Sequence, residues 1–181
     1  MNDREKFIGK YRGTVVNNVD PELRGRLLVQ VPDALGPIPS SWAEPCVPLA
    51  GPTGPPMGVY MVPPIGAGVW VEFEHGDIDY PIWVGCRWGA QSDVPPLAHA
   101  GIPATPNIVF QTTTQHALVM SDTPGPTGGI LLKTATGAMI SVSDVGITIS
   151  NGKGAIINMT GTAIDITGTP VNINAGALTI T

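Results

Sequence analysis

From residue 140 onward, pairs of apolar residues recur at a nearly constant interval. The two members of each pair are two positions apart: Ile140/Val142, Ile147/Ile149, Ile157/Met159, Ile164/Ile166, Val171/Ile173 and Leu178/Ile180. Successive pairs start 7, 10, 7, 7 and 7 residues apart, and the longer interval contains the NGKG sequence at 151–154. Positions i and i+2 share one side of a β-strand but not of a helix, and the intervening Thr, Ser, Asn and Gly are poor helix formers. The repeat therefore predicts short strands rather than a coiled coil, despite its seven-residue period.

Each repeat provides one strand of about five residues and a two-residue turn, which is too short for one chain to enclose its own core. A single turn of a solenoid needs about three such strands, so six repeats would give only about two turns. We therefore expect three chains to form an intertwined trimeric β-helix, or β-prism, in which each chain supplies one side. The paired aliphatic side chains are predicted to form the trimer core: Ile140, Val142, Ile147, Ile149, Ile157, Met159, Ile164, Ile166, Val171, Ile173, Leu178 and Ile180.

The composition changes near residue 90 and divides the chain into two halves. All four tryptophans and 18 of the 23 charged residues precede residue 101. Between the halves, AQSDVPPLAHAGIPATPN is rich in proline and reads as a semi-extended connector. The predicted organisation is a barrel domain at 1–89, a connector at 90–107 and a β-helical spike at 108–181.

The first half is predicted to be a small closed β-barrel. Short apolar segments alternate with turn sequences, and the strand candidates are 8–19, 25–32, 42–49, 58–62, 68–75 and 81–88. In GVWVEFEH (68–75), Val69, Val71 and Phe73 alternate with Trp70 and two glutamates, as expected of a strand with two different faces. Five or six strands in about 90 residues fit a closed barrel, which leaves no exposed sheet edge. The whole chain is thus expected to be all-β.

The composition and motifs exclude several function classes. The net charge is −5 and the basic residues are scattered, unlike a nucleic-acid-binding surface. No phosphate loop, nucleophile motif or cofactor fingerprint is present, so no catalytic or cofactor-binding residue is predicted. Met1–Lys10 is charged rather than apolar, unlike a signal peptide. Cys46 and Cys86 are isolated and are expected to be small buried residues rather than a disulfide or metal ligands.

One acidic cluster, formed by Glu72, Glu74, Asp77 and Asp79 around His75, is the strongest candidate for a catalytic site. A glycosidase needs two carboxyl groups about 5–9 Å apart across a groove, whereas these acids read as solvated strand and turn residues. The histidines at 75, 99 and 116 lack metal-ligand spacing, so no metal is expected.

Four separated pieces of the first half carry a family resemblance. They are GKYRGTVVNNVDPELRGRLLVQVPDALG (9–36), SSWAEPCVPLAG (40–51), PPIGAGVWVEFEHGDIDYPIWVG (63–85) and the proline-rich connector. In this order they resemble the phage baseplate assembly protein V (central spike) family, and the barrel of type VI secretion spike proteins. The segment HALVMSDTPGPTGGILLKTATGAMISVSDVGITI (116–149) resembles the region where such spikes enter their β-prism.

The resemblance implies an oligonucleotide/oligosaccharide-binding (OB) barrel, a homotrimer and a β-helix that points away from a tail tube. It implies as partners a hub protein at the OB end and a separate PAAR-type tip protein at the other end, with no nucleic acid and only transient contact with a target envelope. Relatives with a lysozyme domain carry it between barrel and prism, where residues 90–107 leave no room for one. Type VI spikes usually carry a hub domain ahead of the barrel, whereas this sequence starts only a few residues before the first predicted strand; the hub is therefore expected to be a different polypeptide, which favours a phage or phage-like device.

The carboxy-terminal end is predicted to need a cap, because a prism that ends on its last apolar pair exposes strand edges and axial side chains. The residues expected to bind the tip protein are Ala175, Gly176, Ala177, Leu178, Thr179, Ile180 and Thr181.

The expected function is that of a structural, non-enzymatic central spike of a contractile phage tail or phage-like injection system. The protein would be made and assembled in the cytoplasm and driven into the target envelope on contraction. Two alternatives remain open: a carbohydrate- or nucleic-acid-binding OB module, and an envelope-degrading, lysozyme-like spike.

Overall fold

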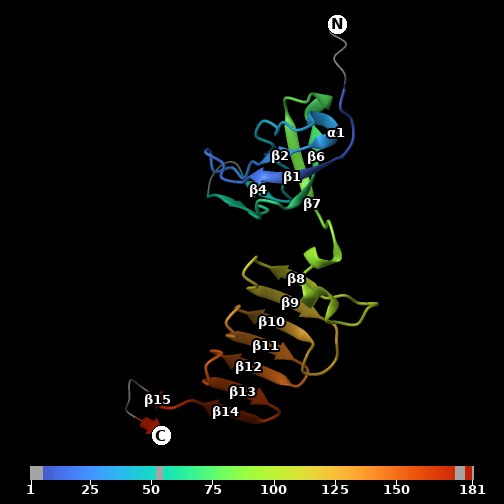
Figure 1. The fold of residues 1–181 in the computed structure, drawn as a ribbon. Coiled ribbons are helices and arrows are strands. Elements are labelled where there is room, and N and C mark those ends of the chain that lie inside the picture. The colour runs from blue at the N-terminus through green and yellow to red at the C-terminus, as the bar shows by residue number, and fades with distance from the viewer. Residues whose placement is uncertain (1–5, 52–54, 174–177, 181) are drawn as a thin grey trace. The chain divides into compact units, whose positions relative to one another are not determined.

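The computed structural model describes residues 6–51, 55–173 and 178–180, and the chain divides after Gln91 into two compact units (Figure 1). Both units consist mainly of strands joined by turns, which confirms the predicted all-β class. The units are described one at a time below.

The first unit is a five-stranded sheet that closes on itself (Figure 1). Its strands are β1 (Tyr11–Asn17), β2 (Leu28–Gln30), β3 (Glu44–Pro45), β6 (Gly68–Phe73) and β7 (Pro81–Arg87), in the spatial order β2-β1-β6-β7-β3. The pair β3–β7 is parallel and the other pairs are antiparallel. Just before β2 and β3, Leu27 and Ala43 exchange two backbone hydrogen bonds of 3.1 and 2.7 Å, which join the outer strands. This closure fits the predicted OB barrel.

Apolar side chains from every strand region fill the barrel. In β6, Val69, Val71 and Phe73 point inward and are buried, while Trp70 and Glu72 are only partly buried, which confirms the predicted alternation. The core residues, each at most 7% exposed, are Val15, Leu27, Val29, Val31, Ala43, Val69, Val71, Phe73 and Trp83. All nine core residues belong to the first unit.

Short elements connect the barrel strands: α1 (Pro32–Leu35), β4 (Ala50–Gly51), β5 (Met57–Gly58) and the 3₁₀ turn η1 (Glu74–Gly76). Every predicted strand of the barrel is longer than the observed one, and at two of them proline limits the pairing. The candidate at 42–49 narrows to β3, because Pro45 and Pro48 have no N–H for a ladder. Of the candidate at 58–62, only Gly58 lies in a strand, the two-residue β5. Pro63 follows the last residue of this candidate.

The second unit contains a seven-stranded antiparallel meander in which each strand pairs with its sequence neighbours (Figure 1). Its strands are β8 (Ile108–Gln111), β9 (Ala117–Ser121), β10 (Gly129–Lys133), β11 (Met139–Ser143), β12 (Gly146–Ser150), β13 (Ile156–Thr160) and β14 (Ala163–Thr167). Ahead of β8 lie two 3₁₀ turns, η2 (Gln91–Asp93) and η3 (Pro96–His99), within the stretch expected to be a connector. There Asn107 donates a 2.8 Å hydrogen bond to the carbonyl of Leu97.

The strand connections alternate between the two sides of the meander at which strands begin and end; these sides are called edges here, and they are distinct from the outer strands β8 and β14. One edge, here called the loop edge, carries the five-residue loops 112–116, 134–138 and 151–155. The other, the turn edge, carries the connections 122–128, 144–145 and 161–162. A five-residue strand with a two-residue turn gives the seven-residue interval, and the ten-residue interval is the same strand with a five-residue loop.

The three loops of the loop edge are built alike. The first residue of each loop is Thr112, Thr134 or Asn151, and its backbone N–H donates to the carbonyl of the fifth residue at 2.8–3.1 Å. Its side-chain oxygen also accepts the N–H of the fifth residue, at 3.1–3.2 Å. Short polar side chains favour such local bonds over ladder pairing. The loops therefore have defined conformations.

The last two repeats form a separate hairpin. Strands β15 (Val171–Ile173) and β16 (Leu178–Ile180) pair with each other and, among the described residues, with no strand of the seven-stranded sheet. Val171 lies opposite Ile180, and Ile173 lies opposite Leu178.

Candidate functional site: the apolar face of the seven-stranded sheet

One face of the seven-stranded sheet is apolar at every strand. The antiparallel register aligns two side chains from each strand into two continuous columns. The first column is Ile108, Met120, Ile130, Val142, Ile147, Met159 and Ile164; the second is Phe110, Leu118, Leu132, Ile140, Ile149, Ile157 and Ile166. We call these fourteen residues the apolar face.

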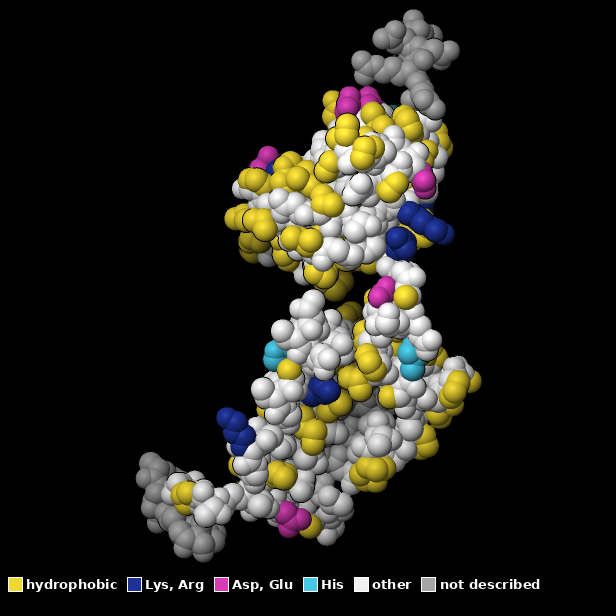
Figure 2. Space-filling view, viewed as in Figure 1, with side chains coloured by type: hydrophobic (Ala, Val, Ile, Leu, Met, Phe, Trp, Pro, Cys, Tyr) yellow, Lys and Arg dark blue, Asp and Glu magenta, His cyan; other side chains and the backbone are white. Residues whose placement is uncertain are grey.

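A single chain leaves this face uncovered. None of the fourteen side chains is buried, and the ten that are most accessible range from 37% exposed at Met120 to 68% at Ile164. Figure 2 shows hydrophobic side chains on the visible surface of this unit. Soluble proteins rarely leave so many contiguous apolar residues in water, and such a surface marks an interface.

The opposite face is different in kind. Its central column is apolar at first, with Val109, Val119 and Leu131, and polar from β11 onward, with Ser141, Thr148, Asn158 and Asp165. Thr148 Oγ1 donates a 2.9 Å hydrogen bond to Asn158 Oδ1 across the strands. From β11 onward the sheet thus has one face that is apolar in both columns and an opposite face whose central column is polar.

The structure places eight of the twelve predicted trimer-core residues on the apolar face, all between Ile140 and Ile166. The other four, Val171, Ile173, Leu178 and Ile180, belong to the separate β15–β16 hairpin. Among the residues expected to bind a tip protein, 175–177 and Thr181 lie outside the described residues. Only the backbone strand is described for the other three, Leu178, Thr179 and Ile180.

Six residues of the apolar face were missed by the sequence analysis: Ile108, Phe110, Leu118, Met120, Ile130 and Leu132. They show the same spacing of two within each strand. The intervals between these pairs are 10, 12 and 10 residues, because loops of five and seven residues separate the strands. Searching for i, i+2 pairs without requiring a seven-residue interval would have found them.

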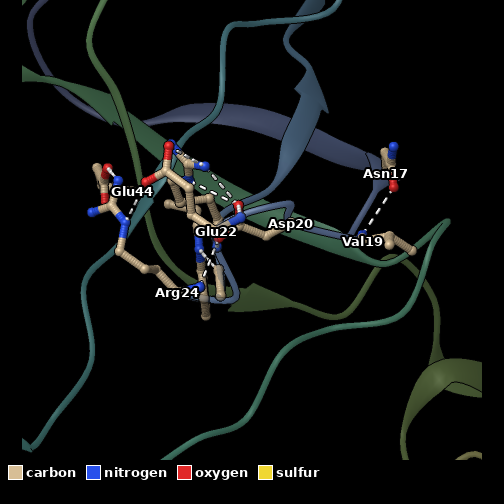
Figure 3. A network of polar contacts seen from close by, with 9 residues as sticks. Asn17, Val19, Asp20, Glu22, Arg24 and Glu44 are labelled. Carbon is tan, nitrogen blue, oxygen red and sulfur yellow. Dashed lines mark hydrogen bonds and ion pairs between the residues drawn. The ribbon is translucent and has the colours of Figure 1, made fainter.

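In the barrel, a polar network organises the loop between β1 and β2 (Figure 3). Asp20 is 4% exposed, and its carboxylate accepts backbone N–H groups of Glu22 (2.9 Å), Arg24 (2.8 Å) and Arg26 (3.2 Å). The Arg26 side chain donates to Asp20 Oδ1 from Nε (3.0 Å) and Nη2 (2.7 Å). Arg24 in turn donates two bonds to the carboxylate of Glu44, at 3.0 and 2.8 Å. The DPELRGR sequence therefore shapes the loop.

Ionisation of Asp20 is coupled to this network. The hydrogen bond from the Arg26 side chain, helped by the backbone N–H groups, holds the pKa of Asp20 well below its usual range although burial opposes the shift. The same contact raises the pKa of Arg26. Both groups are charged at neutral pH and are engaged with each other.

The acidic cluster of the barrel has structural roles in the described residues. Glu72 forms an ion pair with Lys10 across neighbouring strands. Asp77 Oδ1 accepts the N–H of Asp79 at 3.1 Å and so closes the turn before β7. Among the residues that the structure describes, no three His, Cys, Asp or Glu side chains are grouped closely enough to hold a metal ion.

Both cysteines are exposed, contrary to expectation. Cys46 follows Pro45 just past the end of β3, and Cys86 lies opposite Val69 near the end of β7; neither belongs to the buried core cluster. Partial burial still raises the pKa of the Cys86 thiol.

None of the helices within the described ranges has the length and apolar character needed to cross a membrane.

An OB barrel followed by a sheet with one uncovered apolar face defines a structural protein that associates through its second unit. Comparison with protein families agrees with both parts. Residues 11–88 match the type VI secretion system/phage-baseplate injector OB domain, and residues 107–179 match the phage baseplate V C-terminal trimerisation domain. The chain belongs to the phage baseplate V spike family, whose members are components of a phage tail or injection particle. A search of curated proteins found no match to the chain.

Proposed function

We propose that the protein is the homotrimeric central spike of a contractile phage tail or phage-like injection system. Its OB end attaches to a hub protein on the tube, and its β-helical end points toward the target. The spike is assembled in the cytoplasm and is driven into the target envelope when the sheath contracts. The observation that carries this proposal is the fourteen-residue apolar face within a matched trimerisation domain.

Three copies can cover this face by turning it toward a common axis. Each level then contributes two apolar side chains per chain, and the polar columns face water. A packed axis of this kind resists unfolding, because truncating one buried aliphatic side chain to Ala costs about 2–5 kcal/mol and each substitution is present three times. Resistance to unfolding is a property that a piercing element needs.

The end of the spike is proposed to bind a separate PAAR-type tip protein through residues 175–181. Strand β16, at 178–180, supplies backbone groups at this end of the chain. A variant truncated after Asn174 should still form trimers through the seven-stranded sheet but should no longer bind the tip protein. Binding retained by the truncated variant would refute this part of the proposal.

The alternative of a nucleic-acid or carbohydrate-binding module is less well supported. Recognition of single strands needs free cations beside exposed aromatic side chains. Three of the six basic residues described in the first unit are held in ion pairs: Lys10 with Glu72, Arg24 with Glu44, and Arg26 with Asp20. The alternative of a lysozyme-like spike needs a catalytic insertion, and η2 and η3 leave only short turns at that position.

Labelling of particles tests the proposed role directly. An epitope tag fused ahead of the barrel should appear by immunogold electron microscopy on the particle axis, at the tube end. A control tag on the sheath should label the sides. A spike protein that is absent from purified particles, or that labels only their sides, would rule out the central-spike role.

A further inference from the structure

We propose that the three copies join edge to edge, with the loop edge of one copy against the turn edge of the next, and that opposite charges on these edges select this arrangement. The inference rests on the proposed trimer and deepens it by identifying the surfaces that meet. The apolar face explains why copies associate, and the edges explain why they associate as a closed ring.

Charge is separated between the two edges of the sheet. Both lysines of this unit lie at the loop edge, Lys153 within a loop and Lys133 at the end of β10. Two of the three acids of this unit beyond residue 107 lie at the turn edge, Asp122 and Asp144. In the described part of the chain, no ion pair engages Lys133, Lys153, Asp122 or Asp144. Asp144 Oδ2 accepts the backbone N–H of Gly125 at 3.3 Å, a bond that leaves its charge unneutralised. The four charges can therefore pair with another copy.

The two edges also complement each other in apolar surface. An open pocket of about 530 Å³ lies at the loop edge, where the ends of β9, β10, β11 and β12 meet the loops. Its apolar lining includes Leu132, Met139, Ile140 and Ile149. At the turn edge, Val145 occupies the two-residue turn between β11 and β12 and is 50% exposed. Val145 beside Asp144 at the turn edge is therefore complementary to the apolar pocket beside Lys133 at the loop edge.

Symmetry makes this complementarity informative. A closed ring of three copies requires a heterologous interface, in which one surface of each copy meets a different surface of the next. Contact between two loop edges, or between two turn edges, would bring like charges together, which disfavours a two-fold dimer. Loop edge against turn edge brings opposite charges together at each of three interfaces. The distribution of charge on the sheet thus favours a cyclic assembly.

Charge reversal on the full-length protein tests the inference. One variant carries Asp122→Lys and Asp144→Lys, a second carries Lys133→Glu and Lys153→Glu, and a third carries all four substitutions. Sedimentation over a urea series gives the midpoint at which the trimer is lost. We expect each two-site variant to have a lower midpoint than the wild type, and the four-site variant to recover most of the loss, as in a double-mutant cycle. High salt should shrink these differences because it screens surface charges.

Two single variants provide a matched control: Asp144→Lys reverses an acid at the turn edge, and Asp165→Lys reverses an acid in the middle of β14. Asp165→Lys should shift the midpoint less than Asp144→Lys. Unchanged midpoints in both two-site variants would overturn the inference. So would lowered midpoints without recovery in the four-site variant, because the losses would then come from contacts within one chain. A wild-type chain that sediments as a monomer would instead refute the proposed trimer itself.

Discussion

Replacement of Ile164 by Asp should abolish the trimer, because it places a carboxylate in the apolar face. Ile164 is 68% exposed in the single chain. Since full burial of an Ile side chain contributes about 1.5–3 kcal/mol, its burial by neighbouring copies contributes about two thirds of that, or about 1–2 kcal/mol per copy. The apolar contribution lost from three copies is therefore about 3–6 kcal/mol. Three carboxylates at one level add a desolvation cost of several kcal/mol each, which brings the total into the range of a whole domain's net stability.

Size-exclusion chromatography with light scattering measures the outcome. Ala163→Asp is the matched control, because Ala163 precedes Ile164 in β14, is exposed and points to the opposite face. The control should remain trimeric, whereas Ile164→Asp should be monomeric or aggregated. If both variants are soluble trimers of equal stability, the apolar face is not the trimer interface and the reasoning is wrong.

Two further predictions, made with three substitutions, test how the loops are held. Asp20→Asn removes the charge that pairs with Arg26, and it should lower the Tm of the barrel at pH 7. Because the native pKa of Asp20 is depressed, the stability that this pair contributes is present above the ordinary Asp pKa of about 4 and is lost as the pH falls below it. The difference in Tm between variant and wild type should therefore shrink toward about pH 2; a constant difference would contradict this coupling. Gly152→Ala should destabilise the second unit, because Gly152 has a φ of +70° and an added Cβ would lie 2.7 Å from the carbonyl carbon of Gly137. Gly154→Ala, at φ +102° with no atom within 4 Å of its added Cβ, should cost only the conformational strain of about 1–2 kcal/mol. Equal losses in urea unfolding would show that the contact with Gly137 is unimportant.

The alternation of apolar side chains was the part of the fold most accessible from sequence. In β6, and from Ile140 to Ile166, side-chain period alone assigned the strands and their inward or apolar side. The assignment succeeded because a strand has only two faces, so a period of two leaves no other choice. The number of strand candidates then predicted a closed barrel, and the family resemblance identified it as an OB barrel.

Features that depend on pairing between distant residues were not accessible in the same way. The hydrogen-bonded contact of Leu27 with Ala43, which closes the barrel, has no local signal. The apolar-face residues of β8, β9 and β10 were not predicted, because loops of different lengths separate Ile108, Leu118 and Ile130. The last repeats show the reverse problem, since Val171 continues the pattern but pairs in a separate hairpin.

The mass of the intact wild-type protein in solution is the most direct test of the central claim that copies of this chain cover its apolar face. Sedimentation equilibrium should give about 56 kDa, three times the 18.8 kDa of one chain. A folded species of 18.8 kDa that keeps its β-structure at all concentrations would contradict the claim.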